Sequence, residues 1–295
     1  MTRRTTITGK LAKVLAGTLW CASVSAASPA GSGRQPTLPP SETVPFPVRV
    51  MDYGNLTAPL TIVFRYTALA SGAAGQAEIL PGPTKWKINA AFTNLSPASR
   101  LGSEYLTYVL WCITPEGRSI NLGEVTLTGT DGQLDAKLNL RRFGLIITAE
   151  PYLSVSRPNK AVAFEADVAP DSSPRPSVTQ VNCELLSIPI GAGTAQADPV
   201  RTKDPDEPLV IEEARRAIAV ARAAGAEEYA PDTFGTAQQL LRLAQDQQER
   251  GEKKKDVVDT GGEAVFIAED ARVLAVTRQK RAREARTAAS HDTSP

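Results

Sequence analysis

The chain has 295 residues, is 42% hydrophobic and 22% charged, and carries a formal net charge of +1 at pH 7. So small a charge lacks the basic footprint of nucleic-acid-binding proteins, and we expect no nucleic-acid partner. The single histidine, His291, lies near the C-terminus, which excludes a histidine-based triad or acid–base pair on the folded part. We expect no metal site and no cofactor, because the cysteines are few and far apart.

Residues 1–26 have the pattern of a secretory signal peptide. A basic start is followed by mostly apolar or small residues and by Val24-Ser25-Ala26, a small-residue cleavage site. The apolar stretch is shorter than the roughly 20 residues that span a bilayer. Trp20 precedes Cys21, where lipid modification requires a small residue, so we expect no lipoprotein. We expect an exported protein, periplasmic or associated with the outer envelope, with no transmembrane span in the mature chain.

Cleavage after residue 26 would also change the charge of the chain. It removes four positive charges and no negative ones, which takes the formal net charge from +1 to −3. The mature chain stays close to neutral, which again argues against nucleic acid as a partner. The four basic residues are Arg3, Arg4, Lys10 and Lys13.

Residues 27–47 are rich in Pro, Ser, Gly and Thr and predict a disordered linker. Residues 48–190 then show short strand patterns separated by turn residues, which is typical of a β-sandwich or barrel. We expect an antiparallel β-sandwich that is large enough for a core of its own. The predicted strands are Leu60–Thr67, Gln76–Leu80, Thr84–Asn94, Leu106–Ile113, Ser119–Thr128, Gln133–Leu140, Phe143–Glu150, Ala161–Val168 and Val181–Ile188.

Leu106–Ile113 is the centre of this region. It is apolar at nearly every position and contains neither Gly nor Pro, as in a strand that is covered on both faces. Pro115-Glu116-Gly117 supplies a turn after it, and Gly129-Thr130-Asp131-Gly132 supplies a second. We therefore predict that the strands between residues 106 and 150 form an antiparallel meander.

Three motifs in this region resemble a known family: Tyr108-x-Leu110-Trp111, Pro115-x-Gly117 and Leu122-Gly123-Glu124. They are similar to motifs in the extracytoplasmic β-sandwich of anti-sigma-K-factor-type proteins, and the resemblance covers roughly residues 76–168. It implies a β-sandwich. Because its motifs consist of packing and turn residues, it implies no catalytic site, and no sigma-regulating role is carried over.

Cys112 and Cys183 each lie in a predicted strand. In an oxidising compartment they can pair, and the disulfide would close a loop of about 70 residues and contribute around 4 kcal/mol in the chain-entropy model. The alternative is two separate buried thiols that pack as small apolar groups. The sequence does not show whether the two strands are neighbours, so both alternatives stay open.

The composition changes after a second linker, residues 191–208. From residue 209 Ala, Glu, Arg and Gln dominate, and apolar residues recur at helical spacing. Gly225 ends one helix, and Pro231 occupies the favoured first position of the next. The short connections predict an up-down-up three-helix module over residues 209–287, followed by a disordered tail, residues 288–295.

A narrow, Ala-rich seam runs along the third helical segment. Small seam residues allow another helix to approach closely, so the seam could pack within the module or against another envelope protein, and it is our candidate partner contact. Gly261-Gly262 interrupts this segment. Either the two glycines weaken one long helix by roughly 1 kcal/mol each, or the helix restarts there; the continuous apolar phase favours one long helix. The seam residues are Ala264, Ile267, Ala268, Ala271, Leu274 and Ala275.

The helical half also resembles a family. Ala223-Ala224-Gly225-Ala226, followed by Tyr229-Ala230-Pro231, is similar to a three-helix bacterial envelope domain of unknown function that is often found before OmpA-type domains. The resemblance covers roughly residues 208–287. It implies a role in the cell envelope and transfers no functional residue.

Signals of catalysis are sparse. The chain has neither a G-x-x-x-x-G-K-[ST] phosphate loop nor a G-x-S-x-G nucleophile elbow. A carboxylate pair of the glycosidase type is the remaining enzymatic hypothesis. Its candidate residues are Glu104, Glu116, Glu124 and Glu150.

The third helical segment ends in a cluster of cations, which we call the basic end. It either contacts anionic envelope polymers or lipid headgroups, or it is a solvated helix C-terminus whose cations complement the helix dipole. Its cations are Arg278, Lys280, Arg281, Arg283 and Arg286, opposed only by Glu284.

These patterns together predict an exported, non-enzymatic envelope protein that acts as a structural or binding module through its helical region. Its partner would be another envelope protein or an envelope polymer. The alternatives are an extracytoplasmic sensor related to anti-sigma factors and a carboxylate-dependent carbohydrate-active enzyme.

Overall fold

The computed structural model describes residues 42–173, 175–191 and 207–292. The predicted signal peptide, residues 1–26, lies outside the described residues, as do residues 27–41 and 192–206 of the two predicted linkers. Within the described ranges, strands extend to residue 186 and long helices begin at residue 209. The prediction of an antiparallel β region followed by an α region is therefore confirmed.

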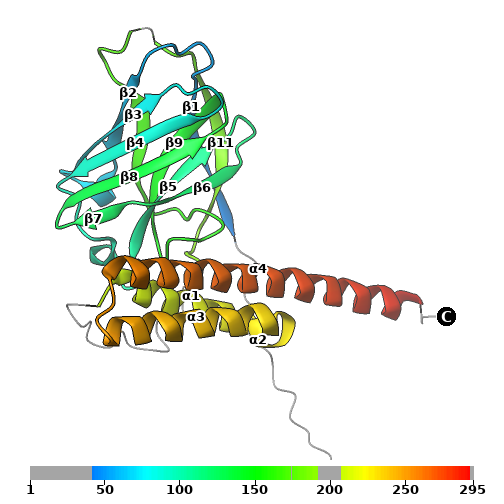
Figure 1. Ribbon diagram of the computed structural model, residues 1–295. Coiled ribbons are helices and arrows are strands. Elements are labelled where there is room, and N and C mark those ends of the chain that lie inside the picture. Colours follow the sequence, from blue (N-terminus) through cyan, green and yellow to red (C-terminus); the bar gives the residue numbers. More distant parts are fainter. Residues whose placement is uncertain (1–41, 174, 192–206, 293–295) are drawn as a thin grey trace, which may run out of the picture. The chain divides into compact units, whose positions relative to one another are not determined.

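Eleven strands form one antiparallel sheet in the described part of the chain. Nine of them run in the order β6-β5-β9-β10-β2-β3-β4-β8-β7, and β1, paired with β11, joins this run at β9 (Figure 1). The strands are β1 (Thr43–Asp52), β2 (Leu60–Tyr66), β3 (Ala74–Leu80), β4 (Trp86–Thr93), β5 (Thr107–Ile113), β6 (Ser119–Glu124), β7 (Thr126–Thr128), β8 (Asp131–Leu138), β9 (Arg142–Glu150), β10 (Val162–Val168) and β11 (Val178–Leu186).

Strand β5 lies inside the sheet, between β6 and β9, and all of its residues are buried. Tyr108, Leu110 and Cys112 point into one hydrophobic cluster, whereas Val109 and Trp111 belong to a second cluster on the other face. Because successive side chains of a strand point to opposite faces, this strand must be apolar at every position. The prediction of a central strand covered on both faces is confirmed.

The two ends of the nine-strand run are joined by a single residue. Val125 connects β6 with β7, is buried, and donates its backbone N–H to the Tyr108 carbonyl over 2.8 Å. Strand β6 also lies close to β8, so the sheet curves until it is nearly closed. The predicted single strand Ser119–Thr128 is therefore two strands, which pair with opposite ends of the sheet.

Two further details correct the predicted meander. The turn between β7 and β8 consists of Gly129 and Thr130, with Gly129 at φ 64°, and Asp131 already belongs to β8. Glycine at the first of two turn residues is typical of a type II′ hairpin. Strand β8 then pairs with β4, and β9 pairs with β5, so these consecutive strands are not neighbours.

Strand β1 begins within the predicted linker, because residues 43–47 pair with β11. Pro45 and Pro47 are two residues apart, so their missing N–H groups lie on the same side of the strand. Only Met51 and Asp52 of β1 pair with β9, so the prolines fall where that side of β1 has no ladder partner. Proline is tolerated at such edge positions.

The helices are α1 (Leu209–Ala223), α2 (Ala226–Tyr229), α3 (Pro231–Glu249) and α4 (Lys254–Asp292). Helix α4 continues through Gly261 and Gly262, in agreement with the preference for one long helix. It also includes residues 288–292 of the predicted disordered tail, where Ala288 and Ala289 favour helix.

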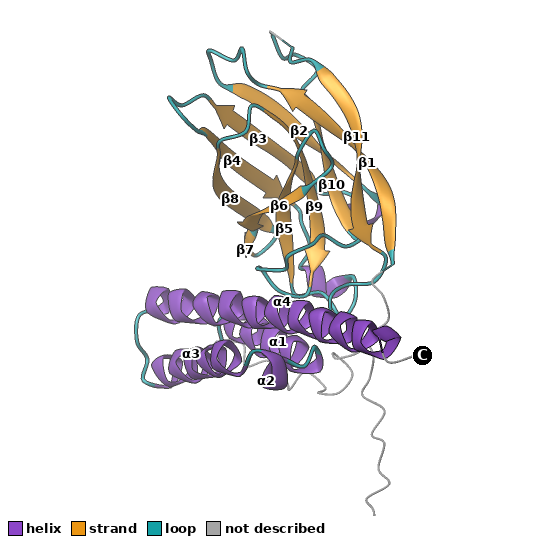
Figure 2. Ribbon diagram, turned by 90° about the vertical axis from the view of Figure 1, so that its right-hand side faces the viewer, coloured by secondary structure: helices purple, strands orange, loops and turns teal. Residues whose placement is uncertain are grey.

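Two hydrophobic clusters hold the described residues together. The strand cluster contains residues of the β region only, with the Phe64, Phe92 and Phe164 rings 5.1–6.3 Å apart. The shared cluster contains Trp111 and Cys183 of the β region together with residues of α1, α3 and α4. Helix α4 lies next to the strands, with α3 on its far side (Figure 1, Figure 2), and Arg216 of α1 also reaches the β region, where it donates to the Ser103 carbonyl over 3.2 Å. The α and β regions therefore share a core, in place of the two separately packed parts that the linker prediction implied.

Candidate functional site on helix α4

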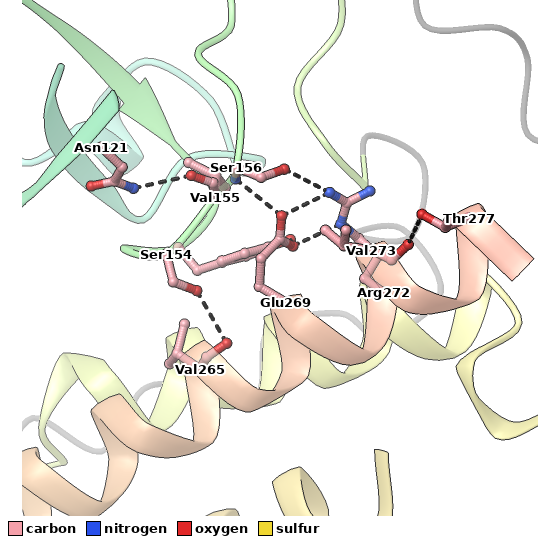
Figure 3. A network of polar contacts seen from close by, with 10 residues as sticks. Asn121, Ser154, Val155, Ser156, Val265, Glu269, Arg272, Val273 and Thr277 are labelled. Carbon is pink, nitrogen blue, oxygen red and sulfur yellow. Dashed lines mark hydrogen bonds and ion pairs between the residues drawn. The ribbon is translucent and has the colours of Figure 1, made fainter. Parts of the chain in front are cut away.

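The loop between β9 and β10, residues 151–161, contacts helix α4, and we call it the docking loop. Tyr152 Oη donates to Glu269 Oε2 over 2.8 Å, and the backbone N–H of Ser156 donates to Oε1 over 3.0 Å. Arg272 donates from Nε and Nη2 to the same carboxylate, each over 2.7 Å, and also from Nη2 to Ser156 Oγ over 2.9 Å. Figure 3 shows the loop side chains converging on this face of α4.

The Glu269–Arg272 pair is largely withdrawn from water, with 5% of the Glu269 side chain and 16% of the Arg272 side chain exposed. Burial opposes the charge of Arg272, but the hydrogen bond and the charge of Glu269 outweigh it and raise the pKa of Arg272. Burial, followed by the Glu269 charge, raises the pKa of Tyr152 well above its ordinary value. Tyr152 therefore stays a neutral donor, and the carboxylate has four hydrogen bonds to replace its hydration.

The docking loop is held from its other side by the β region. Asn121 Nδ2 donates to the Leu153 and Val155 carbonyls, over 2.9 and 3.0 Å. Ser154 Oγ donates to the Val265 carbonyl of α4 over 3.1 Å. The loop backbone is thus fixed between β6 and α4.

A buried carboxyl group, that of Glu150, forms the base of the docking loop. Asn159 donates to it from its backbone N and from Nδ2, over 3.0 and 2.7 Å, and Thr148 Oγ1 donates to Oε1. Trp111 Nε1 in turn donates to Thr148 Oγ1 over 2.8 Å. Burial raises the pKa of Glu150 to about 8, although its hydrogen bonds act in the opposite direction. Glu150 is therefore a fully enclosed part of the loop's support.

The predicted seam is used inside the chain. Its four alanines are fully buried in the shared cluster, and Ile267 packs against that cluster, while Leu274 is exposed. Helices α1 and α3 pack along α4. Other helices of the same chain therefore cover the seam alanines, in the place where a partner protein was expected. These alanines are Ala264, Ala268, Ala271 and Ala275.

The exposed surface of α4 has two parts. Phe266, Val273 and Leu274 are apolar residues exposed on the first half of the helix, with Phe266 at 56% exposure. From residue 276 to residue 289 the side chains are nearly all exposed, and this part carries the five cations of the basic end. Figure 1 shows the same part of α4 running on past α3.

The basic end is only partly engaged by the rest of the chain. Arg278 donates to the Tyr229 carbonyl over 2.6 Å, and Lys280 lies 3.9 Å from Glu284. Among the described residues Arg281 and Arg283 have no carboxylate within ion-pair distance, and the same is true of Arg286. The surface therefore presents cations that are available to an outside anion.

Cys112 and Cys183 are both free and both buried, and they lie in different clusters. Burial raises the pKa of the Cys112 thiol to about 12 and that of Cys183 to about 11. Such thiols are protonated and unreactive at neutral pH. Of the two alternatives, a disulfide or two separate thiols, the structure therefore shows separate thiols that pack as apolar groups.

The four candidate catalytic carboxylates do not form one site. Glu150 is enclosed in the docking loop's support, and Glu116 lies at a surface turn beside Arg118, at 3.8 Å. Glu124 lines a pocket and accepts a hydrogen bond from Thr107 over 2.5 Å. Glu104 lines neither of the two pockets described here. Within the described ranges, no group of three or more His, Cys, Asp or Glu side chains is placed to hold a metal ion.

Two open pockets lie in the β region. The first, about 560 Å³, is lined by Glu116 and by three arginines, Arg118, Arg141 and Arg142. The second, about 690 Å³, lies between β4, β6 and β8. His291 lies in the last turn of α4 and is not a lining residue of either pocket.

Sequence reasoning missed the Glu269–Arg272 pair and its partner Tyr152. A Glu and an Arg three residues apart on a helix are typical of a solvated face, so the pattern gave no sign of a buried contact. The only signal was the position of Glu269, directly after the buried seam residue Ala268.

No family model matches the chain, and neither the curated proteins nor the solved structures include a match to it. Among the described residues, none of the helices combines the length and the apolar composition needed to cross a membrane.

Proposed function

We propose that the protein is an exported, non-enzymatic component of the bacterial cell envelope that attaches to anionic envelope material through the basic end of α4. The observation that carries this proposal is the exposure of residues 276–289 on a helix whose first half is packed on two sides. Lys and Arg clustered at the end of a helix are suited to anionic polymers or headgroups.

The signal-peptide pattern of residues 1–26 supports export, and the two family resemblances support an extracytoplasmic location. The finer fold description that belongs to this proposal is a β-sandwich joined to a three-helix module. Its support is the packing of β1 and β11 over Trp111 of β5, and the mutual packing of the long helices α1, α3 and α4.

The experiment is co-sedimentation of the full chain with purified peptidoglycan sacculi and, separately, with outer-membrane vesicles. The variant replaces Lys280, Arg281, Arg283 and Arg286 by Gln, which keeps helix propensity and removes four cations. Because each cation near an anionic surface contributes about 1 kcal/mol, we expect binding to weaken by well over tenfold. Raising the salt from about 0.1 M to about 1 M shortens the Debye length from about 10 Å to about 3 Å and should release the unmodified protein.

The matched control replaces Lys253 and Lys254 by Gln at the opposite end of α4, where binding should be unchanged. Deleting residues 209–295 is a weaker test, because it would uncover the shared cluster. Binding that is unaffected by the four-residue variant and by salt would overturn the proposal.

A further inference from the structure

The second pocket is formed by the solvent-facing residues of three strands. Lys87, Asn89 and Ala91 alternate along β4 on the face opposite to the core residues Ile88 and Ala90. The cross-strand partner of Asn89 is Asp135, and that of Ala91 is Gln133, both on β8. Because cross-strand partners share a face, these side chains stand side by side. Leu122 and Glu124 of β6 line the same pocket, so side chains surround it from two directions.

The polar lining of this pocket includes acceptors on Asn89, Asp135 and Glu124. Asn89 Oδ1 is buried and has no hydrogen-bond partner among the described residues. Asp135 has no cation within ion-pair distance in the same part of the chain. Glu124 uses one oxygen, Oε1, to accept from Thr107. Buried polar atoms are nearly always hydrogen-bonded, so an unpartnered one that lines a pocket indicates a donor from outside the chain.

The charges around the pocket nearly balance. The charged lining residues are one cation, Lys87, and two carboxyl groups, Asp135 and Glu124, and burial raises the pKa of Glu124. A pocket with so little net charge gives an ion no strong attraction. A neutral ligand with many hydroxyl groups fits better, because each hydroxyl can donate to an acceptor and accept from an amide or an ammonium group. The volume of about 690 Å³ is within the range of small-molecule sites.

We propose that the pocket between β4, β6 and β8 binds a neutral saccharide. Asn89 and Asp135 accept from sugar hydroxyls, Lys87 and the Gln133 amide donate to them, and Leu122 provides an apolar surface for the ring. This site is separate from the basic end of α4 and does not depend on the function proposed for it.

The test titrates the full chain with triacetylchitotriose and, separately, with maltotriose, with binding followed by saturation-transfer NMR. Calcium chloride and spermidine are titrated as ionic probes. We expect saturable binding of at least one saccharide and none of the ionic probes at the pocket. The variants Asn89→Ser and Asp135→Asn should each weaken saccharide binding roughly tenfold, because the first withdraws the amide oxygen and the second replaces one carboxylate oxygen by an amide donor.

The control variant is Glu184→Gln, which changes an exposed carboxylate on β11 that does not line the pocket. It should bind as the unmodified protein does. Circular dichroism verifies that all three variants fold, which the exposed position of Asp135 favours. The proposal is overturned if neither saccharide binds saturably, if Asp135→Asn and Asn89→Ser bind unchanged, or if an ionic probe occupies the pocket instead. The α4 variant that lacks four cations should bind the saccharide as the unmodified protein does, which separates this result from that of the sedimentation test.

Discussion

The two halves of α4 belong to one continuous helix but have opposite surroundings. One face of residues 254–275 packs against α1 and α3, with four fully buried alanines, and the docking loop contacts this half at Val265, Glu269 and Arg272. Residues 276–289 are nearly all exposed and carry five of the helix's cations. We call residues 254–275 the folding half and residues 276–289, where we propose that envelope material binds, the binding half; the boundary between them lies where the packing partners of the helix end.

The largest difference in stability between the two halves should come from a charge placed in the folding half. Ala268→Glu would bury a carboxylate in the shared cluster without a partner, and would overfill a fully packed position. We expect a loss of about 4 kcal/mol or more of unfolding free energy, measured by urea denaturation. The matched variant Ala285→Glu lies in the binding half, where side chains are exposed, and should change stability by less than about 0.5 kcal/mol. Equal effects of the two variants would contradict the division of the helix.

The next effect concerns the ion pairs of the two halves. Glu269→Ala would leave Arg272 and Tyr152 without their buried acceptor, which typically costs about 3–5 kcal/mol. Glu284→Ala removes a carboxylate that lies 3.9 Å from Lys280 at the surface, where such pairs contribute about 0–1 kcal/mol. Both variants are measured by urea denaturation at the same salt concentration. A Glu269→Ala protein that unfolds at the unmodified midpoint would show that the docking loop does not need this carboxylate.

The sequence could predict the places of most strands, but not their partners. Alternating side chains and turn residues predict strands, whereas the pairing of Phe143–Glu150 with β5 depends on contacts between distant residues. Strand β1 was missed because prolines at edge positions resemble a linker. The seam shows the same limit, since helical periodicity gives the apolar side of a helix and not whether its cover comes from the same chain or from a partner.

Glu150 supports the docking loop, which contacts the folding half. The contribution of Glu150 to the unfolding free energy depends on pH. The pKa of Glu150 is about 8 in the fold, against an ordinary value of 4.5. Between these values the unfolded chain has released the proton and the folded chain retains it, so stability falls as pH rises, by about 1.4 kcal/mol per pH unit. Glu150→Gln cannot ionise and should lack this slope, whatever its stability at one pH. Urea denaturation of both proteins from about pH 5 to about pH 8 measures it, and parallel curves would show that Glu150 is charged in the fold.

The smallest effects come from two adjacent glycines in the folding half, and they have opposite signs. A Cβ at Gly261 would lie 2.8 Å from Val210 Cγ1 of α1, closer than real Cβ contacts. Val210 is β-branched and has little rotamer freedom, so Gly261→Ala should destabilise the protein by about 1–3 kcal/mol as an overpacked contact, despite its better helix propensity.

A Cβ at Gly262 meets nothing within 4 Å. Gly262→Ala should therefore gain the full helix propensity and stabilise the protein by about 0.5–1 kcal/mol. Thermal unfolding of the two single variants distinguishes packing from helix propensity, because propensity alone predicts the same gain in stability at both positions. If Gly261→Ala is also stabilising, α1 does not approach α4 as closely as the packing of Val210 requires.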